Sequence, residues 1–144
     1  MKKRILAGLV CLVLLLTVVG SVPVSSEASV RFSGGSGSED DPYLLASLSD
    51  LHTLAEATKT ETFRKKYFRL TADVNEGFDG GIGKDRDHPF SGKFDGNGHT
   101  VRLEISSGGQ YAGMFGYLVG SEVRSLCVDG FVTGSDCVGG ICIC

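Results

Sequence analysis

Hydrophobic residues occupy every second position in two stretches of this chain, residues 67–74 and 101–105. Such alternation is typical of a β-strand with one buried face. We therefore predict strands over both stretches, and a further short one over residues 90–94. The side chains expected to face inward are Phe68, Leu70, Ala72, Val74, Val101, Leu103 and Ile105.

One segment has helical spacing instead. Leu48, Leu51 and Leu54 recur at intervals of three residues, which predicts a helix over about residues 48–58. Ser47 is placed to cap its first turn, with Asp50 completing a capping box. The short apolar run 43–45 follows a proline and predicts a first edge strand.

Turns separate these elements. The chain contains 21 Gly, 3 Pro and no Trp, which favours short strands joined by tight turns over a helical bundle. Residues 75–88 are rich in Asn, Gly and Asp and predict a loop. Residues 95–98 (Asp-Gly-Asn-Gly) predict a tight turn, because Asp and Asn tolerate a positive φ and Gly prefers it.

A repeat emerges after residue 110. Residues 112–116 are echoed by residues 138–142, an offset of 26 residues that falls in the range of solenoid coils. Each unit is too small to bury a face alone and must stack on a neighbour. Because the second unit has barely begun at Cys144, we expect the chain to be truncated at its C-terminus.

The N-terminus has the pattern of a secretory signal. Basic residues 2–4 precede an apolar run of about fifteen residues, too short to span a bilayer. We predict a signal peptide over residues 1–28 and a flexible leader over residues 29–40, with no transmembrane anchor within this chain. The protein is then secreted or held at the cell surface.

The net charge and the histidine content limit the classes of function that this chain can have. Removing residues 1–28 leaves eleven basic and sixteen acidic residues, which argues against nucleic acid as a partner. His52, His88 and His99 are the only histidines, and none stands in a recognisable catalytic motif. We therefore predict a protein that is not an enzyme, with no catalytic residue and no cofactor.

Carboxylates are frequent between residues 73 and 97, and such oxygen ligands suit calcium. No EF-hand spacing occurs, and Asp and Asn have an adequate alternative role in turns, which is the favoured interpretation. If a calcium site exists, its ligands are expected to be Asp79, Asp85 and Asp87.

Four cysteines lie beyond the signal peptide: Cys127, Cys137, Cys142 and Cys144. Export and the even count make all four disulfide candidates, and three pairings are open. Cys142 and Cys144 face the same side of a strand, which disfavours a bond between them. The alternatives are small buried thiols or, least favoured, a zinc site, whose usual spacings are absent.

Several blocks of the chain match a known pattern, namely residues 36–43, 50–55, 66–74, 90–101 and 113–117. The most specific is Phe90-Ser91-Gly92-Lys93-Phe94-Asp95-Gly96-Asn97-Gly98-His99-Thr100-Val101. In these blocks the chain resembles bacterial surface and secreted proteins with GLUG repeats. The resemblance implies a right-handed parallel β-helix over residues 41–144, a cell-surface location, and a role in adhesion or presentation.

Two functions remain open from the sequence. One is a structural or binding module at the cell surface, whose partners would be a host, matrix or cell-surface protein or a glycan. The alternative is an accessory domain of a larger secreted hydrolase or protease whose catalytic part is absent here. Further Gly-rich repeats would favour the first, and a zinc motif or paired catalytic carboxylates would favour the second.

Overall fold

The computed structural model describes residues 30–106, 108 and 111–140. The predicted signal peptide, residues 1–28, lies outside this part of the chain. The elements, in chain order, are β1 (Tyr43–Leu45), α1 (Leu48–Ala57), β2 (Tyr67–Leu70), β3 (Val74–Phe78), β4 (Lys93–Asp95), β5 (Thr100–Ser106), β6 (Tyr111–Ala112), β7 (Glu122–Arg124), β8 (Cys127–Thr133) and β9 (Cys137–Val138).

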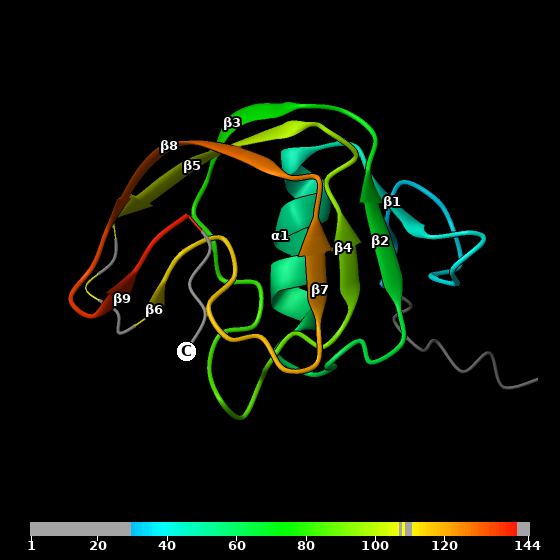
Figure 1. The fold of residues 1–144 in the computed structure, drawn as a ribbon, viewed down its shortest axis with the longest axis horizontal. Coiled ribbons are helices and arrows are strands. Elements are labelled where there is room, and N and C mark those ends of the chain that lie inside the picture. Colours follow the sequence, from blue (N-terminus) through cyan, green and yellow to red (C-terminus); the bar gives the residue numbers. More distant parts are fainter. Residues whose placement is uncertain (1–29, 107, 109–110, 141–144) are drawn as a thin grey trace, which may run out of the picture.

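The strands form three sheets in which all paired strands are parallel, ordered β1-β2-β4-β7, β3-β5-β8 and β6-β9. Figure 1 shows the three sheets arranged around the core as the sides of a coil. Each strand pairs with its counterpart in the next coil: Phe94 lies opposite Phe68 on one side and Val123 on the other. The prediction of a mainly β, parallel solenoid with one short helix is confirmed.

The repeat found in the sequence is a structural repeat. Ala112 of β6 pairs with Val138 of β9, which is the predicted offset of 26 residues. The backbone continues this ladder, because the Gly139 amide donates to the Ala112 carbonyl and the Met114 amide donates to the Gly140 carbonyl. The two glycine-rich units are therefore neighbouring coils on one side of the solenoid.

The single strand predicted over residues 67–74 is wrong. The chain forms β2 and β3 there, which belong to two different sheets, with a corner at residues 71–73. At this corner the Thr71 amide donates to the Leu45 carbonyl, and the Asp73 carboxylate accepts from the Thr100 amide. Alternation in sequence continues through such a corner, so it did not reveal the break. β3 also extends to Phe78, into the predicted loop.

Helix α1 agrees with the prediction. Ser47 caps it with φ −151°, and its hydroxyl accepts a hydrogen bond from the Asp50 amide at 3.3 Å. The buried Asp50 carboxylate in turn accepts from the Ala46 amide at 2.8 Å and from the Ser33 hydroxyl at 2.7 Å. Leu51 and Leu54 are fully buried in the core. No helix in the described part of the chain is long and apolar enough to cross a membrane.

The segment before β1 differs from the predicted flexible leader. From residue 32 it folds back on the first coil, where the Leu44 amide donates to the Gly34 carbonyl at 2.8 Å. The Phe32 ring lies 5.6 Å from the Phe68 ring, centroid to centroid. Because Gly37 also accepts from the Tyr67 amide at 3.1 Å, the segment is attached to β1 and β2 together. The small, polar residues of this segment suggested a flexible chain, because composition does not show such long-range contacts.

The predicted turn at residues 95–98 is present, and it forms a corner of the coil. Asn97 and Gly98 have φ values of +51° and +77°. The Asp95 carboxylate accepts from the Asn97 amide at 2.9 Å, and the His99 amide donates to the Gly96 carbonyl at 2.8 Å. Since β4 and β5 lie in different sheets, the turn joins two sides of the solenoid rather than two strands of a hairpin.

Phenylalanine rings fill the centre of the coils. Phe68 and Phe94, which are register partners on β2 and β4, are each 1% exposed. Phe90 and Phe115 join them from the loops, with ring centroids 5.2–5.7 Å from their neighbours. Aromatic pairs at such distances add to the free energy of burying the rings. This cluster connects the four-stranded sheet to the glycine-rich loops.

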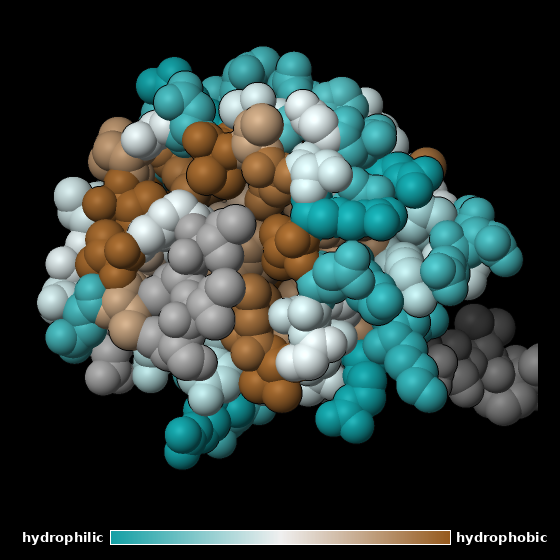
Figure 2. All heavy atoms as spheres, viewed as in Figure 1, coloured by the Kyte–Doolittle hydropathy of each residue, from teal (hydrophilic) through white to brown (hydrophobic). Residues whose placement is uncertain are grey.

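The last described coil is covered less well than the coils before it. Val101 of β5 is fully buried, whereas its register partner Val128 on β8 is 38% exposed. In the view of Figure 2, hydrophobic side chains gather on the face that looks toward the reader, and hydrophilic ones surround them. The exposed large hydrophobic residues of this coil are Val119, Val128, Phe131 and Val138. We call this surface the end face.

Replacing Phe115 tests the aromatic core. We expect Phe115→Ala to lower the free energy of unfolding by about 3–5 kcal/mol, because it leaves a cavity between Phe90 and Phe94. Phe131, which is 53% exposed, provides the matched control, and Phe131→Ala should change the same quantity by less than ~0.5 kcal/mol. Denaturant unfolding followed by circular dichroism measures both. Equal effects of the two substitutions would contradict this description of the core.

Candidate functional site

A groove runs across the outer face of the four-stranded sheet. Side chains alternate in and out along each strand, so the residues that flank the buried Phe68 and Phe94 point away from the core. The parallel register then places these outward residues in two rows across β2, β4 and β7. The groove encloses about 230 Å³ and is lined by Glu39, Pro42, Tyr67, Phe68, Arg69, Lys93, Phe94, Asp95, Glu122 and Arg124.

The first row consists of Tyr67, Lys93 and Glu122. Lys93 Nζ lies 3.3 Å from Glu122 Oε2 and 5.5 Å from the centroid of the Tyr67 ring. The Tyr67 hydroxyl donates to Glu39 Oε2 at 3.2 Å, which joins the folded N-terminal segment to the row. The hydrogen bond to Glu122 raises the pKa of Lys93, and the neighbouring Tyr67 adds to this increase. Lys93 is therefore a cation at neutral pH.

The second row consists of Arg69, Asp95 and Arg124. The Asp95 carboxylate lies between the two guanidinium groups, with Oδ2 3.6 Å from Arg69 Nη2 and 3.0 Å from Arg124 Nη2. The Asp95 side chain is 17% exposed, whereas those of Arg69 and Arg124 are 44% and 60% exposed. A guanidinium has five N–H donors, so both arginines keep donors that face the groove and solvent.

The groove is balanced in charge. Three cations and three carboxylates line it, and each row pairs them across neighbouring coils. Such a surface offers hydrogen-bond donors and acceptors side by side without a strong net potential. This site is not among the residues predicted from the sequence, because its residues are 26–29 positions apart and belong to no local motif. An alignment of the coils would have shown charged residues at the equivalent outward positions.

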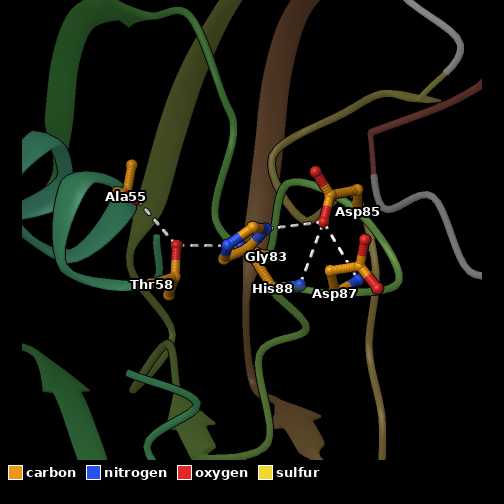
Figure 3. A network of polar contacts seen from close by, with 6 residues as sticks. All are labelled: Ala55, Thr58, Gly83, Asp85, Asp87 and His88. Atoms are coloured by element: carbon orange, nitrogen blue, oxygen red, sulfur yellow. Dashed lines mark hydrogen bonds and ion pairs between the residues drawn. The ribbon is translucent and has the colours of Figure 1, made fainter. Parts of the chain in front are cut away.

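The three predicted calcium ligands do not converge. Asp79 pairs with His52 at 3.5 Å. Asp85 Oδ1 accepts hydrogen bonds from the Asp87 amide at 3.0 Å, the His88 amide at 2.9 Å and the His88 ring at 2.8 Å, as Figure 3 shows. No group of three or more His, Cys, Asp or Glu in the described residues is arranged to hold a metal ion.

A buried contact fixes the loop that carries Asp85. The Thr58 hydroxyl at the end of α1 donates to the Ala55 carbonyl at 2.7 Å and accepts from the Gly83 amide at 3.2 Å (Figure 3). Thr58 is 1% exposed, so water does not compete for these bonds. The hydrogen bonds to Asp85 lower the pKa of its carboxyl, mainly through the His88 side chain. Together these contacts give the carboxylate a structural role in the turn.

The cysteines have different environments. Cys137 of β9 is disulfide-bonded, and Cys127 of β8 is a free, exposed cysteine. The expectation that Cys127 takes part in a disulfide is therefore wrong, whereas Cys142 and Cys144 lie outside the described residues, so the pairing among the other three candidates stays a prediction.

The chain is similar to part of halomucin from the archaeon Haloquadratum walsbyi, with 40% identity over 86 residues. The similar region makes up 52% of this chain but 1% of halomucin, so the chain corresponds to a very small part of that protein. No protein-family model and no solved structure matches the chain. The resemblance to proteins with GLUG repeats therefore stays a prediction.

The corner carboxylate Asp73 provides a test by pH. The hydrogen bond from the Thr100 amide lowers the pKa of Asp73, and the bond from His99 at 3.1 Å lowers it further. A carboxyl whose pKa is lower in the folded state stabilises the fold above its unfolded pKa of about 4. That contribution is lost as the pH falls through the folded-state value.

We therefore expect Asp73→Asn to reduce the Tm by a few degrees at neutral pH, and this reduction to shrink as the pH falls through the folded-state pKa of the wild-type carboxyl. Thermal unfolding across this pH range measures the difference. Asp129→Asn, at an exposed position on β8, is the matched control. A Tm difference for Asp73→Asn that is independent of pH would show that the charge of Asp73 is not involved.

Proposed function

We propose that this chain supplies coils of a β-solenoid in an exported cell-surface protein, where it acts by contact rather than by catalysis, as a scaffold for adhesion or presentation. The supporting observation is the stack itself. Successive segments pair in parallel and place outward side chains in regular rows around one core cluster, against which partly buried residues of the last described coil pack. A rod of this kind holds binding groups at fixed spacing.

The end face supports a role within a longer stack. The inward-facing position that Val101 occupies on β5 is buried, whereas its register partner Val128 on β8 is exposed. In the described residues, β7, β8 and β9 each have a neighbouring strand on one side only. An apolar layer next to unpaired strand edges fits the underside of another coil, which would bury the valines and continue the ladder.

The similarity to halomucin supports the surface location. Halomucin is a large archaeal surface glycoprotein, and 40% identity over 86 residues relates this chain to one small part of it. The secretory pattern of residues 1–28 points to the same compartment. The polar groups of the solenoid also suit a scaffold, because His52, His88 and His99 each pair with a single aspartate at a separate place in the fold.

The cellular location of the protein tests the proposed function. We expect an epitope-tagged copy of the full chain, expressed in the producing organism, to be found outside the cytoplasm. Protease added to intact cells should degrade it while leaving a cytoplasmic marker protein intact. Recovery of the tagged protein in the cytoplasmic fraction, protected from the protease, would refute the proposal.

The end face provides a second test. Because it resembles the surface between two coils, we expect the purified chain to self-associate at high concentration, and Val128→Ser to weaken this association. Val30 is the matched control, since it is 37% exposed against 38% for Val128 but lies at the opposite end of the described chain. Sedimentation velocity over a concentration series measures the effect. If Val30→Ser weakens association as much as Val128→Ser, the end face is not the contact surface.

A further inference from the structure

We propose that the groove across β2, β4 and β7 binds a neutral, hydroxyl-rich glycan, lying across the strands along the two charged rows. This inference deepens the proposed function and rests on it, since an exported module meets glycans outside the cell. The two ideas can fail separately, because binding to a purified protein does not depend on where the cell places it.

The rows define the shape of the ligand. Parallel strands lie about 4.8 Å apart, so three strands give each row a length of ~10 Å. Each row presents one polar group per coil, at a spacing comparable with the repeat of a β-linked pyranose chain. The hydrogen bond between Tyr67 and Glu39 adds a further polar pair to the groove lining beside the first row. An extended oligomer with one polar contact per unit therefore fits better than a compact molecule.

Charge balance disfavours strongly ionic ligands. An anionic ligand that binds the remaining donors of the two arginines would be repelled by the Asp95 carboxylate, which both arginines hold at 3.0 and 3.6 Å. A cationic ligand would compete with Lys93, which holds Glu122 at 3.3 Å. A neutral ligand displaces no ion pair, and the fixed charges strengthen its hydrogen bonds.

Hydroxyl groups match the hydrogen-bond donors and acceptors that these rows leave available. A hydroxyl both donates and accepts, so neighbouring sugar hydroxyls can bond to an arginine and a carboxylate at once. Arg124, with 60% of its side chain exposed, and Glu122, with 50%, are the most accessible partners. Tyr67 adds an aromatic surface for the apolar face of a sugar ring. A neutral peptide is a poorer match, because most of the groove lining is charged and offers little apolar surface to peptide side chains.

Binding to purified chain tests the proposal. The probes are three neutral tetrasaccharides (cellotetraose, mannotetraose and N-acetylchitotetraose) and one acidic one, tetragalacturonate, all titrated to millimolar concentrations. We expect at least one neutral probe to bind, and to bind more tightly than tetragalacturonate. NMR chemical-shift changes should centre on β2, β4 and β7. No binding by any neutral probe, or tighter binding of the acidic one, would overturn the proposal.

Substitutions locate the site. Arg124→Ser should weaken binding of the neutral probe about tenfold, as expected for the loss of a charge-assisted hydrogen bond. Arg102→Ser is the matched control, because Arg102, whose side chain is 51% exposed against 60% for Arg124, pairs with Glu104 on a different sheet. Glu122→Ser, in the other row, gives a second variant if Arg124→Ser fails to fold. Equal affinity of the groove variants and the Arg102→Ser control would place binding elsewhere and overturn the proposal.

Discussion

The backbone ladder between coils is the constraint on which this structure depends. Every strand in the described part of the chain finds its hydrogen-bond partners in another coil rather than in a hairpin, so residues about 26 positions apart are forced into register. A single coil buries too little to be stable, and its strand edges would remain unpaired. Stability is therefore a property of the stack, and the last described coil is less buried because only one of its sides lies against another described coil.

The same ladder creates both the core and the groove. On the inner side it superimposes Phe68 and Phe94, which pack with Phe90 and Phe115 into one aromatic cluster. On the outer side it aligns charged residues of alternating sign, such as Arg69, Asp95 and Arg124. Packing on one side thus fixes the positions of polar groups on the other. This coupling makes a solenoid face suitable for binding an extended ligand.

Polar contacts at the corners keep the coils in register. The Asp73 carboxylate bridges to the Thr100 amide in the next coil, and Asn97 Nδ2 donates to the Leu70 carbonyl at 3.3 Å in the coil before it. Both residues follow short strands, where the backbone leaves the ladder and its amides need other partners. The loop around Asp85 uses its carboxylate in the same way. Asp79 and Asp85, which look like metal ligands in sequence, thus have histidines or backbone amides as partners.

The sequence alone was enough to determine the period of the repeat, the helix with its Ser47 cap, and the turn at residues 95–98, because each depends on neighbouring residues or on simple spacing. The sequence did not reveal the corner at residues 71–73 or the folded N-terminal segment. Alternation and composition carry no information about the long-range contacts that form both. The groove could not be read from any local pattern, since Arg69, Asp95 and Arg124 come from three coils. Only the tertiary structure decides which outward residues meet, because the register between coils is set by burial of the core.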